Sequence, residues 1–136
     1  GSMEDKILVT SHLGNNKYKT VLSNGRTEII ADEPIAKGGS DLGPAPRELL
    51  CMSLAACTSI TLRMYSDQKK WEIGEIDVDV ELESSETETI FHRKIRFGSS
   101  ITEEMKNRLL LVADKCPVHK IFSKGIKINT ELIMNT

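Results

Sequence analysis

Cysteine is scarce in this sequence, with three residues in a chain of 136. An odd and low count argues against the disulfide framework of a small secreted protein. It fits a reducing compartment, in which paired thiols are more often catalytic than structural. No signal peptide follows Met3, and we interpret Gly1 and Ser2 as the remnant of a tag. We therefore expect a cytoplasmic protein.

An excess of either charge is also missing, since 18 Lys and Arg residues stand against 20 Asp and Glu residues. This balance argues against nucleic acid and against an anionic membrane as partners. The glycines of residues 32–44 match neither G-x-x-x-x-G-K-[ST] nor G-x-G-x-x-G, so turn geometry explains them better than a phosphate site. Internal repeats and low-complexity segments are absent, and the length predicts one domain over residues 3–136.

One long uncharged stretch dominates what is present. Residues 44–65 predict a helix with Pro46 in its first turn, where proline is tolerated. Residues 49–62 carry no charge, and their apolar side chains fall on every face. The stretch is shorter than the roughly 20 apolar residues of a membrane span, and serines and threonines interrupt it. We expect the central helix of a soluble core, buried on all sides, with Cys57 at its middle.

Alternating apolar and polar residues predict strands on both sides of this helix. The predicted strands are residues 6–12, 17–23, 26–31, 72–83, 90–97 and 125–133. Asn24-Gly25 is a strong hairpin signal between the second and third strands. Three basic residues are expected opposite the acidic residues of 72–83, namely Arg93, Lys94 and Arg96. The fold class is therefore α+β, with antiparallel sheets in the order βββ-α-ββ-α-β.

A second helix is predicted after a capping box formed by Ser100 and Glu103, and Pro117 is expected to end it. Its apolar face consists of Met105, Leu109, Val112 and Cys116. One small meander and one hairpin offer little surface to cover an apolar central helix. We therefore predict an intertwined homodimer, in which a second copy of the chain covers it.

Two cysteines stand out by their positions, Cys57 in mid-helix and Cys116 at the end of the second helix. As a thiolate, Cys57 would attack a peroxide O–O bond and become a sulfenic acid, with which Cys116 would condense to a disulfide. An external thiol or dithiol would reset the pair. Packing is the alternative role for Cys57, because free cysteine is often simply buried. Cys51 lies about 240° from Cys57 round the helix, so we assign it to the core.

A buried thiol needs a positive group or a donor nearby to offset the rise in its pKa. The candidates are Arg26, Arg47 and Arg63. Arg63 is off the face of Cys57, and Arg47 is about 15 Å away along the helix. An arginine that arrives from a strand, as Arg26 would, or from a partner chain is geometrically easier.

A metal site is a third possibility for this region, because Cys116 and His119 have C-x-x-H spacing. With Cys57 they would supply three ligands, whereas structural zinc usually takes four. We therefore expect no metal and no other bound cofactor. His119 is expected at the rim of the site or on the surface.

The pattern DEP…KGG.D.GP.P.ELL…LAAC.S.TLRMY, followed by CPVHK, resembles the OsmC/Ohr family of osmotically inducible and organic hydroperoxide resistance proteins, in particular its OsmC-like branch. The resemblance covers nearly the whole chain. It implies an intertwined α+β homodimer with active sites at the subunit interface. It also implies Cys57 as the peroxidatic cysteine, Cys116 as the resolving cysteine, and peroxiredoxin-like reduction of hydroperoxides by thiols.

Two positions depart from the family pattern. Its peroxidases carry a glutamate ten residues before the reactive cysteine, where this chain has Arg47 with Glu48 beside it. These peroxidases also carry an arginine in their first hairpin. The corresponding position in this chain is near Asn16, and the nearest basic residues are Lys17 and Lys19. Two hypotheses follow. The chain is a hydroperoxide reductase, or it is a non-catalytic dimeric binding module with an apolar interface cleft.

Overall fold

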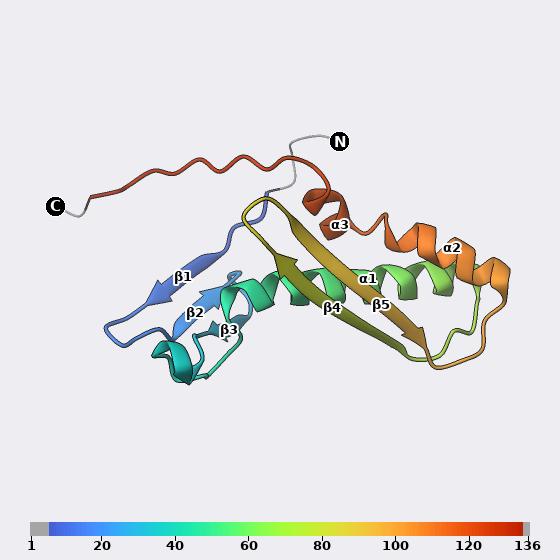
Figure 1. Cartoon of the computed structure of the whole chain (residues 1–136), viewed down its shortest axis with the longest axis horizontal. Helices are drawn as coiled ribbons and strands as arrows, with labels where there is room; N and C mark the ends of the chain where they lie inside the picture. The colour runs from blue at the N-terminus through green and yellow to red at the C-terminus, as the bar shows by residue number, and fades with distance from the viewer. Residues whose placement is uncertain (1–5, 135–136) are drawn as a thin grey trace. The chain divides into compact units, whose positions relative to one another are not determined.

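The computed structural model describes residues 6–134. The chain divides into two compact units, the first ending at Leu50 and the second beginning at Cys51. Its elements, labelled in Figure 1 except for η1, are β1 (Thr10–Leu13), β2 (Thr20–Ser23), β3 (Glu28–Ala31), η1 (Ile35–Lys37), α1 (Pro46–Lys69), β4 (Ile76–Ser84), β5 (Thr89–Phe97), α2 (Glu103–Ala113) and α3 (Pro117–Phe122). The predicted α+β class with antiparallel sheets is confirmed.

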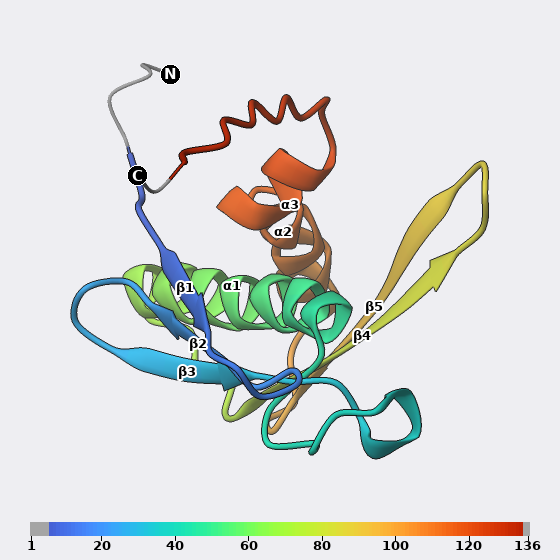
Figure 2. The same cartoon turned by 90° about the vertical axis from the view of Figure 1, so that its left-hand side faces the viewer.

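The N-terminal unit contains a three-stranded antiparallel meander, drawn in shades of blue in Figure 2. β1 pairs with β2, and β2 pairs with β3, so that Val21 lies opposite Ile30. The predicted meander is confirmed, although each strand is only four residues long.

The turn between β2 and β3 is organised by Asn24. Its side-chain Oδ1 accepts hydrogen bonds from the backbone N–H groups of Arg26 (2.9 Å) and Thr27 (2.8 Å). Gly25 adopts a φ of 91°, a conformation that glycine reaches without strain. The hairpin prediction is confirmed, but Arg26 belongs to this turn and not to the third strand, because the side chain of Asn24 holds its backbone N–H.

The loop from Asp32 to Pro44 folds back on the meander. The backbone N–H of Asp32 donates to the carbonyl of Pro44 (3.1 Å), and its buried carboxylate accepts from the N–H groups of Glu33 (2.7 Å) and Leu42 (3.2 Å). A Cβ atom at Gly43 would collide with the backbone oxygen of Ile30. The loop glycine therefore permits a close backbone approach, in line with the turn reading of this stretch.

Helix α1 begins with Pro46 in its first turn. The Oε1 atom of Glu48 accepts a hydrogen bond from the backbone N–H of Ala45 (2.8 Å), which satisfies one of the free donors at this end. The helix ends at Lys69, and Lys70 has a left-handed φ of 57°. The predicted central helix is confirmed, with one more turn at its C-terminal end.

Burial of α1 on all sides is wrong for the single chain. The buried residues of α1 recur every fourth position, as Leu54, Thr58, Leu62 and Ser66. Several large apolar side chains away from this stripe are half exposed or more: Met52 (50%), Ile60 (55%) and Met64 (67%). One chain thus packs a single stripe of a helix that is apolar all round.

Helix α1 is also long and apolar enough to cross a membrane, and 22% of its most apolar 18-residue stretch is buried. Length and composition alone are weak evidence for a membrane span, because the core helices of soluble proteins can have both.

Strands β4 and β5 form a long antiparallel hairpin, as the alternation predicts. Lys94 lies opposite Asp79, and Arg96 forms an ion pair with Asp79 (2.9 Å) on the outer face. Arg93 lies opposite Val80 instead, so its expected place across from the acidic residues is wrong. Neighbouring strand residues point to opposite faces, which puts Arg93 on the apolar face with Ile95.

The first turn of α2 is capped by Thr102, whose side-chain oxygen accepts from the backbone N–H of Met105 (3.1 Å). The capping box predicted from Ser100 is therefore wrong by two residues. Pro117 does not end α2, which stops at Ala113, but occupies the first turn of α3. Proline suits that position because its missing N–H would be unpaired in any case.

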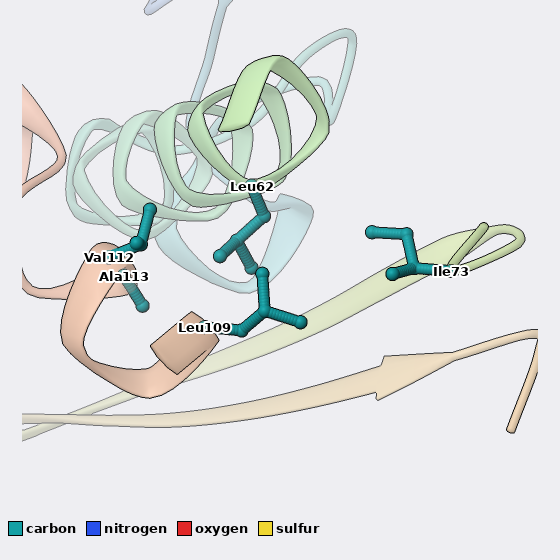
Figure 3. Close-up of a cluster of buried hydrophobic side chains, with 5 residues drawn as sticks. All are labelled: Leu62, Ile73, Leu109, Val112 and Ala113. Atoms are coloured by element: carbon teal, nitrogen blue, oxygen red, sulfur yellow. The ribbon is translucent and has the colours of Figure 1, made fainter. Parts of the chain in front are cut away.

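The core of the C-terminal unit forms where α1 meets α2. In Figure 3, Leu62 of α1 points toward Leu109 of α2, and Ile73 approaches from the segment before β4. Leu62 and Ile73 are fully buried. The cluster is Leu62, Ile73, Leu109, Val112 and Ala113. It fixes the face of α1 on which the following segments pack.

The last predicted strand, residues 125–133, does not form. Residues 125–134 have no regular secondary structure, and Ile128 (85%) and Leu132 (84%) are largely exposed. A strand is completed by hydrogen bonds to a neighbouring strand. The alternation is present in this segment, but no strand of the described chain pairs with it.

Candidate active site

Cys57 is a half-buried residue at the middle of α1. Its thiol has Cys116, the backbone of Val118 and the side chain of Thr61 as neighbours, and each of them shifts its pKa. The two cysteines that stand out in the sequence are therefore neighbours in the structure. Both belong to the C-terminal unit.

Cys116 is fully buried and caps the N-terminus of α3. Its Sγ atom accepts a hydrogen bond from the backbone N–H of His119 (3.3 Å). Pro117 restricts the backbone of Cys116 to the extended region, in which the structure has it (φ −63°, ψ 139°). All three cysteines are free thiols in this structure.

The pKa of Cys57 is raised above the usual thiol range. Burial is the largest cause, and the neighbouring Cys116 thiol raises the pKa further. The N–H of Val118 and the side chain of Thr61 act in the opposite direction without cancelling these effects. None of these influences comes from a cationic side chain. Within this environment Cys57 is a protonated thiol at neutral pH.

The predicted supporting residues lie as follows. Arg26 and Arg47 are exposed, and Glu48 caps α1; all three belong to the N-terminal unit. Arg63 donates to the backbone carbonyl of Gly74 (2.6 Å). Activation of Cys57 by Arg26, Arg47 or Glu48 therefore stays a prediction.

Cys51 is half-buried, so its assignment to the core holds only in part. Among residues 6–134, no group of three or more His, Cys, Asp or Glu side chains is placed to hold a metal ion. The C-x-x-H segment forms a helix cap instead, in which the backbone of His119 contacts Cys116.

His119 is half-buried next to Arg93, a residue that the sequence predicts across from the acidic residues of 72–83. The Nη2 atom of Arg93 lies 3.1 Å from Nδ1 of His119 and 3.2 Å from Oδ1 of Asp114. Its Nη1 atom donates to Oγ1 of Thr58 (2.9 Å), the residue that follows Cys57. The signal that could have revealed Arg93 is its position in the alternation, between the inward-facing residues Phe91 and Ile95.

Arg93 also lines a cavity of about 350 Å³ within the C-terminal unit. The apolar part of its wall comes from α1, β5, α2 and α3, and includes Leu54, Phe91, Ile95, Leu110 and Phe122. The rings of Phe91 and Phe122 are stacked, with centroids 4.9 Å apart. Arg93, Asp114 and His119 form its charged side.

The described residues thus form an α+β protein with one free cysteine in the middle of a helix and another at the start of a later helix. The family model described as OsmC-like protein matches residues 38–131. This is more than half of the chain, and the chain therefore belongs to the OsmC family. No curated protein shows significant similarity to it.

Solved structures share the fold. A protein from Psychrobacter arcticus 273-4, described as an osmotic stress induced and detoxification response protein, has 21% identity and a TM-score of 0.72, with 88% of this chain and 91% of that chain covered. The OsmC like protein from Mycoplasma pneumoniae has 21% identity, a TM-score of 0.70 and 89% coverage of both chains. The organic hydroperoxide resistance protein OhrB of Bacillus subtilis has 22% identity and a TM-score of 0.60, with 86% and 90% covered. At these identities the similarity establishes the fold.

Proposed function

We propose that the protein is a thiol-dependent reductase of organic hydroperoxides, with Cys57 as the peroxidatic and Cys116 as the resolving cysteine. The observation that carries the proposal is the proximity of the two free thiols, through which Cys116 shifts the pKa of Cys57. Membership of the OsmC family supports it, as do the names of similar structures, which include organic hydroperoxide resistance proteins from Bacillus subtilis and Elizabethkingia anophelis.

The reaction has three balanced steps. The Cys57 thiolate attacks one peroxide oxygen, the O–O bond breaks, and the alkoxide takes up a proton and leaves as an alcohol. Cys57 is then a sulfenic acid. The sulfur of Cys116 attacks it, a disulfide forms, and the hydroxyl group leaves as water. An external dithiol reduces the disulfide and becomes oxidised itself. No metal or other resident cofactor takes part in this proposal, and we place the protein in the cytoplasm.

Activation of Cys57 requires a positive group, because burial raises its pKa. We assign this role to Arg26 or to an arginine of a second copy, such as its Arg47. A homodimer is supported by the apolar side chains of α1 that one chain leaves exposed, such as Ile60 and Met64. Glu48 and His119 are assigned supporting positions, Glu48 at the start of α1 and His119 beside Cys116.

Turnover tests this proposal. We expect the reduced wild-type protein to consume cumene hydroperoxide with dithiothreitol as the electron donor, Cys57→Ser to be inactive, and Cys51→Ser to retain the wild-type rate. Loss of activity in Cys51→Ser with full activity in Cys57→Ser would contradict the assignment. So would a wild-type rate equal to that of dithiothreitol alone.

A second candidate function is a non-catalytic dimeric binding module. The raised pKa of Cys57 favours it, together with Arg47 at the position where the family's peroxidases carry glutamate. This candidate predicts that Cys57→Ser binds an apolar ligand as well as the wild type does, and that neither consumes peroxide. Binding of an apolar fluorophore to the two proteins, measured beside the turnover assay, separates the candidates.

A further inference from the structure

Arg93 is a charged residue on the apolar face of β5. Its side chain is 13% exposed, and its neighbours on that face are Phe91 and Ile95. Removing a guanidinium from water costs several kcal/mol unless well-placed partners compensate. An apolar side chain at this position would avoid that cost. The presence of arginine therefore indicates a task that only its hydrogen bonds perform.

The three partners of Arg93 come from three different segments. Nη1 donates to Oγ1 of Thr58 on α1 (2.9 Å). Nη2 contacts Oδ1 of Asp114 at the C-terminal end of α2 (3.2 Å) and Nδ1 of His119 on α3 (3.1 Å). Arginine has donors but no acceptor, so in a hydrogen bond with Arg93 the Nδ1 atom of His119 is the acceptor.

Each partner is close in sequence to one of the two reactive sulfurs. Thr58 directly follows Cys57, and its hydroxyl also donates to the carbonyl of Leu54 (2.7 Å). Asp114 precedes Cys116 by two residues. His119 follows Cys116 by three residues and donates its backbone N–H to the Cys116 sulfur (3.3 Å). One planar guanidinium thus connects the backbone that carries Cys57 with the backbone on both sides of Cys116.

We infer that Arg93 is a positioning residue for disulfide closure, which holds the Cys116 segment against α1 so that the second sulfur reaches the first. This inference rests on the proposed function. Arg93 acts on the second chemical step, attack of Cys116 on the Cys57 sulfenic acid, and not on the first, attack of Cys57 on the peroxide. The rigid fork of arginine suits this task better than the single ammonium of lysine, because it donates in two fixed directions.

The test separates the two steps in Arg93→Gln. We expect sulfenic acid formation at Cys57 to keep its wild-type rate within about twofold, and disulfide closure to slow by about ten- to hundredfold, as expected when a reacting group is misplaced by about 1 Å. Single-turnover mixing with cumene hydroperoxide, quenched with dimedone, measures both rates. The dimedone adduct of Cys57 accumulates in Arg93→Gln and is minor in the wild type. Arg93→Lys is expected to lie between the two.

Arg96→Gln is the matched control. Arg96 is on the outer face of the same strand and pairs with Asp79, so its loss should leave both rates unchanged. Closure at the wild-type rate in Arg93→Gln overturns the inference, and so does an equal slowing of both steps. If Arg93→Gln does not fold, Arg93→Lys decides by the same criteria.

Equilibrium with a dithiothreitol redox buffer distinguishes failure of this inference from failure of the proposed function. In that buffer the Cys57–Cys116 disulfide is formed without any peroxide. The inference predicts an equilibrium constant for closure about tenfold lower in Arg93→Gln, which corresponds to a reduction potential about 30 mV higher. An unchanged constant overturns it. A wild type that closes in this buffer but does not react with hydroperoxide contradicts the proposed function alone.

Discussion

At the scale of single residues, Asp32 shows how burial and hydrogen bonding compete. Burial acts to raise its pKa, but the backbone N–H groups of Glu33, Leu42, Ser40 and Tyr18 together bring the pKa below its usual value. The unfolded chain binds this proton more readily than the folded protein does. The resulting stability is therefore present above the unfolded pKa and is lost as the pH falls through the lower, folded pKa.

We expect Asp32→Asn to lower the urea midpoint at neutral pH, because the amide NH₂ group cannot accept the hydrogen bonds that a carboxylate oxygen accepts. The difference from the wild type should narrow as the pH falls from about 7 to about 3. Urea unfolding across this range measures it. Glu33→Gln, which removes the adjacent negative charge, is the control. A difference that stays constant down to the lowest pH would show that Asp32 makes no pH-dependent contribution.

Arg93 belongs to the same scale and shows what sequence reading missed. Its positive charge suggested that it pairs with the acidic residues of the neighbouring strand. Its position in the alternation instead places its side chain on the inner face with Phe91 and Ile95. Strand parity decides the direction of a side chain more firmly than charge complementarity does, because alternate residues must point to opposite faces. The prediction from charge is confirmed only for Lys94 and Arg96, which lie opposite Asp79 and Asp77.

At the scale of elements, the start of α2 can be tested directly. Thr102 caps this helix through the N–H of Met105. We expect Thr102→Ala to lower the free energy of unfolding by about 1 kcal/mol. Ser100→Ala should change it by less than about 0.5 kcal/mol, as is usual for surface substitutions. Chemical unfolding of both variants gives the comparison, and a larger loss for Ser100→Ala would restore the capping box predicted from the sequence.

The elements that the sequence predicted well are those with their own periodicity. Helix α1 and the β4–β5 hairpin were predictable because their patterns extend over many residues. The burial of α1 was not, since it depends on what packs against each face. For the same reason residues 125–133 have a strand pattern but no strand, because the hydrogen-bonding partner is not part of their own sequence. The prediction that Cys57 and Cys116 form a pair was based on the family resemblance and on the chemistry of thiols, and not on periodicity.

At the scale of the whole molecule, the proposed homodimer would cover what one chain leaves exposed. Ile126, Ile128 and Leu132 fall on one side of the alternating C-terminal segment, and all are at least 61% exposed. We expect this segment to pair with a strand of the second copy. Ile128→Glu should then weaken the dimer, whereas Lys127→Glu, on the alternate side, should leave it intact.

Sedimentation equilibrium measures this assembly. The wild type and Lys127→Glu should have the mass of two 15.2 kDa chains, and Ile128→Glu should shift toward the mass of one. A wild type that is monomeric in dilute solution would contradict the dimer. Equal masses for the two variants would place the C-terminal segment outside the interface.

The most direct measurement of the central claim is the intact mass of the reduced protein after brief exposure to a small excess of cumene hydroperoxide. The dithiol account predicts the loss of two hydrogens in the wild type and a non-reducing peptide map that joins Cys57 to Cys116. Cys57→Ser should show no such loss. An unchanged wild-type mass, or a disulfide that joins Cys51 to either of the other two cysteines, would contradict the account.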